Sequence, residues 1–244
     1  MIQKTDVLFF GAHPDDVELG CGGTVHKLSS SGLKVGIVDL TRGELGTRGT
    51  PAIRKAEAEE AARILGLTVR DNCDISDGHI DISRENKARV IQKIRQYQPD
   101  LVILPYFSDR HPDHVNASKL VKECIYYAGT EKWPVGIPVA DLPAWRPKFY
   151  LYYMLAEPFE PNVIVDITGH EEARLQAFRA YKSQFFVPGH DSNEKETWIS
   201  RPEFSEQLQA RLRFYGYQIG TAFAEPFFSD QPIPLADLMA LTRR

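Results

Sequence analysis

The chain has 244 residues, 43% hydrophobic and 25% charged, which is typical of a globular protein with one large domain, here expected over residues 1–244. Its formal net charge of -4 at pH 7 argues against a general nucleic-acid binder, because such proteins are usually basic. No apolar stretch approaches the roughly 20 residues that cross a bilayer, so we expect neither a nucleic-acid nor a membrane partner.

The first half of the chain alternates strand-like and helical segments. Strands are expected over residues 6–12, 34–41, 69–75 and 100–105, and helices over residues 22–31, 51–65, 84–97 and 112–128. The helix over 51–65 is the best marked, because Pro51 takes its first position and Gly66 follows its end. This alternation predicts an α/β fold whose sheet is mostly parallel and has helices on both faces.

The second half is less regular. Residues 129–147 are rich in proline and are expected to form an ordered, irregular excursion. Strands are expected over 149–154 and 163–168, and helices over 170–184 and 202–219. The polar stretch 187–197 is expected to be a mobile loop or lid. It contains His190, for which contact with substrate is the less favoured of the alternatives.

Two clusters of polar residues follow apolar strand-like runs. His13, Asp15 and Asp16 follow the first strand, and His111 and His114 follow the fourth. Ligands of doubly wound sheets bind outside the carboxyl ends of the strands, at the point where the strand order reverses. We therefore expect the two clusters to form one metal site at the strand ends.

The residue types in these clusters suggest a division of roles. His13, Asp16 and His114 supply two imidazoles and one carboxylate, which leave a position open for water as in catalytic zinc sites. Asp15 is then suited to take a proton from that water. His111 would stabilise an oxyanion or protonate a leaving group.

The same spacing admits another metal. His-x-Asp followed by a distant histidine is also the ligand triad of non-haem Fe(II) oxygenases. Those enzymes usually have all-β scaffolds, whereas this chain alternates helix and strand. Zn²⁺ is therefore the expected cofactor, with Fe²⁺ as the alternative.

Positive charge gathers after the second strand, at Arg42, Arg48 and Arg54. Arg54 shares the buried stripe of its helix and is expected to point toward the strand ends, where it would bind a substrate carboxylate or sugar hydroxyls. The alternative is a structural ion pair with Glu44 or Glu57. Other substrate contacts are expected from Arg42, Glu44, Arg110 and Asp113, although Asp113 would also serve as a helix cap or as a partner of a metal ligand.

A glycine-rich run at residues 20–23, with Asp39 about twenty residues further on, resembles a dinucleotide-binding fingerprint. The third glycine is missing, because Val25 occupies its position. A pyrophosphate would also meet Asp15, Asp16 and Glu18. We instead expect these glycines to let a helix pack closely against the sheet.

The cysteines and the start of the chain bear on the compartment. Cys21, Cys73 and Cys124 are odd in number and widely spaced, so no disulfide framework is expected. Residues 1–6 lead into a strand without the architecture of a signal peptide. We expect a cytoplasmic protein. His26, His79 and His170 lack an acidic strand end beside them and are expected in surface or packing roles.

Several segments of the sequence resemble a known protein family. Residues 12–16, the helix with Arg54 and residues 111–114 are similar to the LmbE-like, or PIG-L-like, zinc N-deacetylases, which act on N-acetylglucosamine-containing substrates. Residues 10–24, 39–50 and 110–114 look most like the bacillithiol-pathway deacetylases. The resemblance implies a Rossmann-like fold, a homo-oligomer (hexamer or trimer), a substrate role for Arg54, zinc on His13, Asp16 and His114, Asp15 as general base and His111 as transition-state stabiliser.

These observations predict a metal-dependent hydrolase that removes the N-acetyl group from an N-acetylglucosaminyl substrate. The arginines favour an anionic aglycone, so N-acetylglucosaminyl L-malate, of bacillithiol biosynthesis, is the first candidate. Another N-acetylglucosamine conjugate or an oligosaccharide is the alternative. An iron oxygenase and a sugar-binding module without chemistry are more remote ones.

Overall fold

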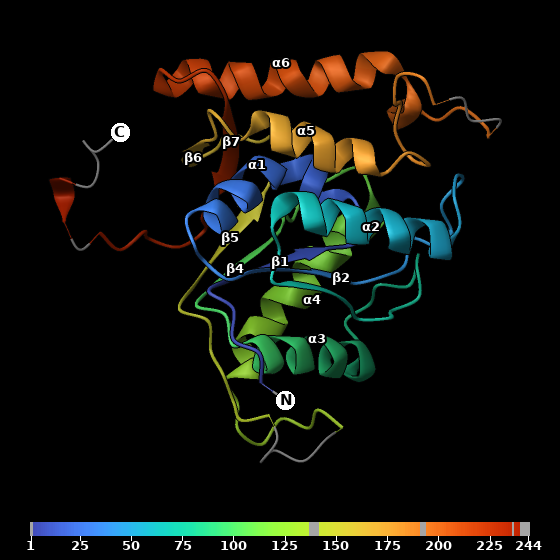
Figure 1. Ribbon diagram of the computed structural model, residues 1–244. Coiled ribbons are helices and arrows are strands. Elements are labelled where there is room, and N and C mark those ends of the chain that lie inside the picture. The colour runs from blue at the N-terminus through green and yellow to red at the C-terminus, as the bar shows by residue number, and fades with distance from the viewer. Residues whose placement is uncertain (1, 137–141, 191–193, 236, 240–244) are drawn as a thin grey trace.

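Both halves of the chain contribute strands to one sheet, whose strand order is β3-β2-β1-β4-β5-β7-β6 (Figure 1). The computed structural model describes residues 2–136, 142–190, 194–235 and 237–239. The strands are β1 (Val7–Gly11), β2 (Val35–Asp39), β3 (Val69–Asn72), β4 (Leu101–Pro105), β5 (Phe149–Tyr153), β6 (Val163–Asp166) and β7 (Ala224–Phe228). The helices are α1 (Asp16–Ser30), α2 (Pro51–Leu65), α3 (Arg84–Tyr97), α4 (Pro112–Ala128), α5 (Glu171–Ala180), the 3₁₀ helix η1 (Trp198–Ser200) and α6 (Pro202–Ile219).

The sheet is mostly parallel, as the sequence predicts. Strands β1, β2, β3, β4 and β5 pair in parallel, and β7 runs antiparallel to both β5 and β6. From β1 the chain builds outward through β2 to β3, and it then returns to place β4 on the other side of β1. The strand order therefore reverses between β1 and β4, and a crevice is expected there at the carboxyl ends.

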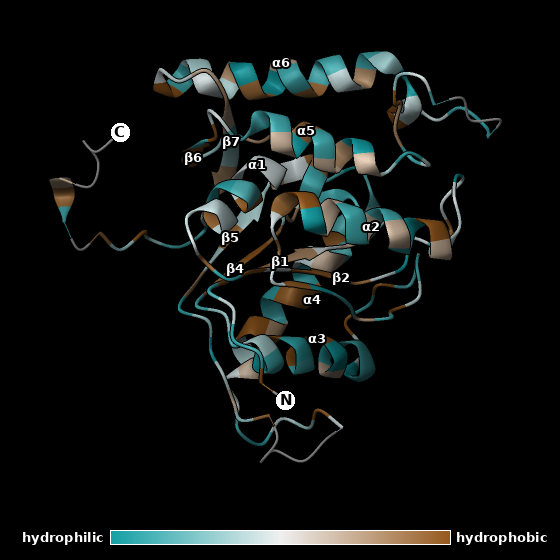
Figure 2. Cartoon of the chain, in the orientation of Figure 1, coloured by the Kyte–Doolittle hydropathy of each residue, from teal (hydrophilic) through white to brown (hydrophobic). Residues whose placement is uncertain are grey.

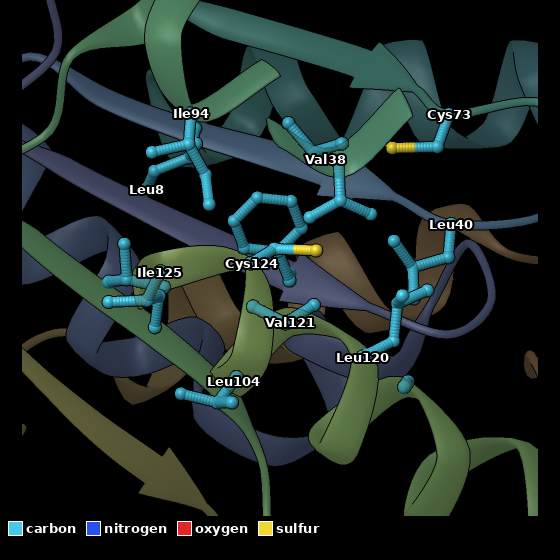
Figure 3. Packing of buried hydrophobic residues seen from close by; sticks show 14 of the residues in the cluster. Leu8, Val38, Leu40, Cys73, Ile94, Leu104, Leu120, Val121, Cys124 and Ile125 are labelled. Carbon is cyan, nitrogen blue, oxygen red and sulfur yellow. The ribbon is translucent and has the colours of Figure 1, made fainter. Parts of the chain in front are cut away.

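Alternating residues of the central strands serve two hydrophobic cores. Leu8 and Phe10 of β1 pack with α3 and α4, in the cluster that Figure 3 shows around Leu120, Val121 and Cys124. Val7 and Phe9 face the other way, toward α1, α2 and α5, as side chains two apart on a strand must. Figure 1 shows α6 as an outer layer over α5. In Figure 2 the central strands are largely brown, whereas the helices carry both colours.

Helix α2 begins and ends where its sequence signals predict. The hydroxyl of Thr50 accepts a hydrogen bond from the backbone N–H of Ile53, and Pro51 follows it. Gly66 ends the helix in the left-handed conformation, with φ 68°, which a residue without Cβ adopts at little cost. This local chemistry places Arg54 in the first turn of the helix, from which its guanidinium reaches the turn after β1.

Helix α1 begins at Asp16, whereas the sequence predicts a helix only from residue 22. The helix is interrupted at Cys21, which has φ -153° and ψ 29°, so the predicted helix matches only the part after this break. The six predicted strands are shorter than predicted by one to three residues each, and helix α5 is also shorter. Helix α5 ends at Ala180 and the chain then turns, and strand β3 ends at Asn72.

Strand β7 was not predicted at all. Its segment contains Glu225 and Pro226, and neither a charged residue nor a proline favours a central strand. The strand nevertheless lies between β5 and β6, with Glu225 fully buried. Parts of the predicted excursion over 129–147 and of the predicted loop over 187–197 lie outside the described residues.

The glycines of α1 provide close packing, as expected. A Cβ at Gly20 would overlap the ring of Tyr153, and one at Gly23 would lie 2.6 Å from Ile167. Asp39 accepts hydrogen bonds from Arg70 at 2.8 and 2.9 Å, so it is engaged by the protein itself. These contacts account for the glycines without a bound nucleotide.

The three cysteines are free thiols and are buried. Across the described part of the chain, no helix combines the length and the apolar character that a membrane span requires.

Replacing Gly20 tests this packing. Gly20→Ala should lower the free energy of unfolding by about 1 to 3 kcal/mol, because the added methyl group meets a well-packed interior. Tyr153 has little freedom to move, since it is fully buried and donates a hydrogen bond to the carbonyl of Phe10. Urea denaturation measures the change. The control is Ser30→Ala in the last turn of the same helix, where the expected change is within about 0.5 kcal/mol; equal stabilities of the two variants would contradict the packing role.

Candidate active site

A cavity of about 560 Å³ opens at the crevice between β1 and β4. The turn after β1 contributes His13, Asp15 and Asp16 to its wall, and the segment after β4 contributes His111 and His114. Both clusters of the sequence therefore reach one cavity. Arg54, Arg110 and Asp113 also line it.

Three of these residues form a compact set of potential metal ligands. One atom each of His13, Asp16 and His114 lies within 4.8 Å of the other two. Nε2 of His114 is 3.3 Å from Oδ1 of Asp16, and Nδ1 of His13 is 3.6 Å from Oδ2 of Asp16. Two imidazoles and a carboxylate fit a divalent transition metal such as zinc. A second set, His13 with His111 and Asp113, meets the same criterion.

Each imidazole of the first set is held from behind by carboxylates. Nδ1 of His114 lies 2.9 Å from Asp109, which also accepts hydrogen bonds from the backbone N–H groups of Ala156 and Glu157. Nε2 of His13 lies 3.1 Å from Asp77 and 3.3 Å from Asp113. Carboxylates in this position fix the orientation of metal-binding histidines.

These contacts shift the pKa values of the cluster. Burial disfavours a charged His114, but the charge of Asp16 and hydrogen bonds to Asp109 and Asp16 outweigh it and raise its pKa to about 9. For His13, burial is likewise outweighed by its carboxylate partners, and its pKa lies well above the usual value. Burial would raise the pKa of Asp16, but the charge of His114 holds it well below its ordinary value. Opposite charges thus stabilise one another in the interior.

Asp15 occupies a strained position beside this cluster. Its φ is 120°, a region that non-glycine residues rarely adopt. Arg54 holds it by donating hydrogen bonds to its carboxylate at 2.8 Å and to the carbonyl of Pro14. Burial raises the pKa of Asp15 to about 7, although the charge of Arg54 acts in the opposite direction. Arg54 therefore points inward, as expected, and its ion-pair partner is Asp15 rather than Glu44 or Glu57.

His111 is the N-cap residue of helix α4, directly before Pro112. Its Nδ1 accepts a hydrogen bond from the backbone N–H of Asp113, so the neutral ring carries its proton on Nε2. Burial, together with the charges of His114 and His13, lowers the pKa of His111. The helix cap is thus His111 and not Asp113, whose carboxylate instead contacts His13 and accepts a hydrogen bond from the N–H of Gly78.

Comparison with known proteins shows the family to which this chain belongs. The family described as "PIG-L: GlcNAc-PI de-N-acetylase" matches residues 8–125. A diacetylchitobiose deacetylase from Thermococcus kodakarensis is 31% identical over 231 residues, which cover 90% of this chain and 80% of that protein. The chain belongs to the PIG-L family.

Two further proteins, one curated sequence and one solved structure, are also similar to this chain. A probable N-acetyl-alpha-D-glucosaminyl L-malate deacetylase from Bacillus anthracis is 28% identical over 202 residues, which cover 76% of this chain and 84% of that protein. The crystal structure of a conserved protein from Thermus thermophilus is 36% identical with a TM-score of 0.84, covering 96% of this chain and 98% of that one. The fold of this chain thus matches that of the solved structure over nearly its whole length.

Not every residue that the sequence predicts for the site lies in the wall of this cavity. Arg42 is exposed and pairs with Asp74 at 2.8 Å, outside the cavity wall. The carboxylate of Glu44 accepts hydrogen bonds from the backbone N–H groups of Arg42 and Asp77, so it joins two loops. His190 is exposed and lies outside the wall.

His26, His79 and His170 take surface or packing roles, as expected, and His79 is exposed. His26 and His170 contact one another through their Nδ1 atoms at 2.9 Å. Nδ1 of His79 lies 3.2 Å from the carbonyl oxygen of Asp77. None of these three histidines belongs to the cavity wall.

Sequence reasoning missed several residues of the cavity. Asp77 lies in a loop after β3, without the strand-end motif that marks the two clusters. Asp109, two residues before His111, lies outside the cavity wall but contacts His114, and it was not predicted either. Most of the outer wall comes from the second half of the chain and carries no polar motif: Leu155, Ala156, Gln184, Phe185, Trp198, Ile199, Phe204, Gln207, Leu208 and Arg211.

Asp109→Asn tests the support of His114. Both oxygens of Asp109 accept hydrogen bonds, so an amide would turn an N–H group toward one of these donors. Loss of such a partner typically weakens metal binding about 10- to 100-fold. Competition between the protein and a chromophoric chelator for Zn²⁺ measures the affinity. The matched control is Asp74→Asn at the exposed pair with Arg42; if both variants bind Zn²⁺ as tightly as the unchanged protein, the role given to Asp109 is wrong.

Proposed function

We propose that this PIG-L protein hydrolyses the N-acetyl amide of an N-acetylglucosamine-containing glycoside. In this proposal His13, Asp16 and His114 hold a divalent metal, with Zn²⁺ as the first candidate. Asp15 is the general base, and His111 stabilises the transition state. The observation that carries the proposal is the convergence of all five side chains on one cavity in a member of a deacetylase family.

The chemistry divides between the metal and the side chains. When bound, a divalent cation supplies Lewis-acid chemistry, because it polarises a carbonyl and lowers the pKa of a water. Asp15 removes the proton from the water that attacks the acetyl carbon. Nε2–H of His111 donates a hydrogen bond to the oxygen on which negative charge develops. As the C–N bond breaks, the proton taken by Asp15 passes to the amine nitrogen, so the products are acetate and a free glucosamine amine.

Arg54 has a different role in this scheme from the one predicted. Its guanidinium is used on Asp15 and Pro14, which keeps the carboxylate beside the metal ligands in a strained backbone conformation. We assign Arg54 to holding the base, with substrate contact as a second role, because the residue also lines the cavity.

For the aglycone we propose an anionic group, with N-acetylglucosaminyl L-malate as the substrate. Arg110 supports this choice. It lines the cavity, and its guanidinium lies 4.4 Å from the ring centre of Trp198. A guanidinium stacked on an aromatic ring keeps its N–H groups free at the edge, where a carboxylate can accept two hydrogen bonds.

A second candidate is a chitobiose-type disaccharide. The relative from Thermococcus kodakarensis is a diacetylchitobiose deacetylase, and the outer wall contains Phe185, Trp198 and Phe204, against which a sugar ring can pack. The iron oxygenase and the non-catalytic sugar-binding module find no support in this family. The homo-oligomer and the cytoplasmic location stay predictions.

The role of Asp15 can be tested with Asp15→Asn. Asparagine is the closest replacement in shape, and like aspartate it tolerates a positive φ better than most residues do. We expect kcat for acetate release to fall by about 10²- to 10⁴-fold while the metal stays bound, as elemental analysis would show. The exposed Asp81→Asn serves as the control. A variant that keeps both its metal and the full rate would rule out Asp15 as the base.

The aglycone proposal predicts a substrate-dependent effect at Arg110. For Arg110→Met we expect KM for N-acetylglucosaminyl L-malate to rise about 10- to 100-fold, as for loss of a charge-assisted hydrogen bond, with little change for a methyl N-acetylglucosaminide. Arg42→Met, outside the cavity wall, should change neither. Acetate release measures both substrates and diacetylchitobiose. A strong preference for diacetylchitobiose would favour the second candidate, and no acetate from any of them with Zn²⁺ present would contradict the deacetylase.

A further inference from the structure

The break in helix α1 lies only a few residues after the proposed metal ligand Asp16. Residues 16–20 form one short helical segment, and the helix resumes after Cys21. Such a break leaves backbone carbonyls at the end of the first segment, and N–H groups at the start of the second, without helical partners. These groups are buried here, so they require other partners.

The freed N–H groups are bound by a carboxylate from β7. Gly23 donates to Oε1 of Glu225 at 2.9 Å, and Thr24 donates to Oε2 at 2.7 Å. Glu225 is fully buried. A carboxylate that accepts two backbone N–H groups acts as a cap for the second helical segment.

The freed carbonyl of Leu19 is bound by two arginines. Arg174 of α5 and Arg211 of α6 both donate to it, at 2.5 and 3.4 Å. Nε of Arg174 also lies 3.1 Å from Oε1 of Glu225. Arg211 reaches further and donates to the carbonyl of Leu155. One buried cluster of charges therefore serves both sides of the break.

The cluster is joined to the cavity through the first helical segment. Leu19, whose carbonyl the arginines hold, lines the cavity, and so does Arg211. At the other end, the N–H of Leu19 donates to the carbonyl of Asp15 at 2.9 Å. The segment with Asp16 is thus fixed between the strained residue Asp15 and the charge cluster at the break.

We propose that Glu225, Arg174 and Arg211 are positioning residues that set the direction of the first segment of α1, and through it the places of Asp15 and Asp16. The inference rests on the proposed function only in assigning Asp16 to a metal. Removing one member leaves buried charges and backbone groups without partners, so the segment should move or loosen.

The test compares full-length Glu225→Gln and Arg211→Met with a matched control, Arg95→Met. Arg95 is also a buried arginine that donates to backbone carbonyls, those of Ala128, Thr130 and Trp133, but it lies on α3 against the opposite face of the sheet. Arg95→Met therefore reports the general cost of losing such a residue. Arg211→Met keeps the test usable if Glu225→Gln does not fold, because Arg211 is only partly buried.

Two readouts separate positioning from general instability. Amide hydrogen exchange over residues 16–20 should become at least about 10-fold faster in both cluster variants but not in Arg95→Met. Zn²⁺ affinity, measured by chelator competition, should fall about 10- to 100-fold in the cluster variants alone. Unchanged exchange over residues 16–20, or the same change in Arg95→Met, would overturn the inference. Wild-type protein that binds no Zn²⁺ would instead contradict the proposed function, and the exchange readout would still decide the positioning role.

Discussion

The ion pair between Arg54 and Asp15 joins the first turn of α2 to the turn between β1 and α1 in the protein interior. Both side chains are nearly buried, with exposed fractions of 4% and 7%. The pair is needed because Asp15 lies in a rare backbone conformation beside Asp16, and both strain and charge repulsion oppose that arrangement. The capping of α2 by Thr50 and Pro51 contributes to this ion pair, because it fixes the backbone position from which the Arg54 side chain extends.

The other acidic groups of the crevice are buried too and likewise need partners for their charges. Asp16, Asp77 and Asp113 are also nearly buried, and a buried carboxylate without a partner is costly. Each is paired differently, through His114, through His13 or through backbone N–H groups. These pairs fix the side-chain rotamers, so the candidate site is preorganised by the interactions that make its charges tolerable.

The parts of this arrangement that were predictable from the sequence are those with a local signal. The capped helix α2 and the two strand-end clusters are such cases, because the cause of each lies within a few neighbouring residues. The start of α1 was missed because its glycines and its break at Cys21 depend on Tyr153, Ile167 and Glu225, which come much later in the chain. Strand β7 was missed for the same reason, since Glu225 is buried there between the N–H groups of α1 and the guanidinium of Arg174.

The residues that the sequence predicts and those that only the fold reveals also differ in their proposed function within the cavity. The residues of the proposed chemistry, from His13 to His114, lie inside the stretch 8–125 that the PIG-L family matches. The outer wall, including Trp198, Phe204 and Arg211, comes from outside that stretch. Removal of an acetyl group requires the same groups whatever sugar conjugate bears it, whereas recognition of the aglycone depends on what the wall presents. Family membership therefore bears on the reaction more directly than on the substrate, and the choice between an anionic aglycone and a second sugar depends on side chains that only the folded chain brings to the cavity.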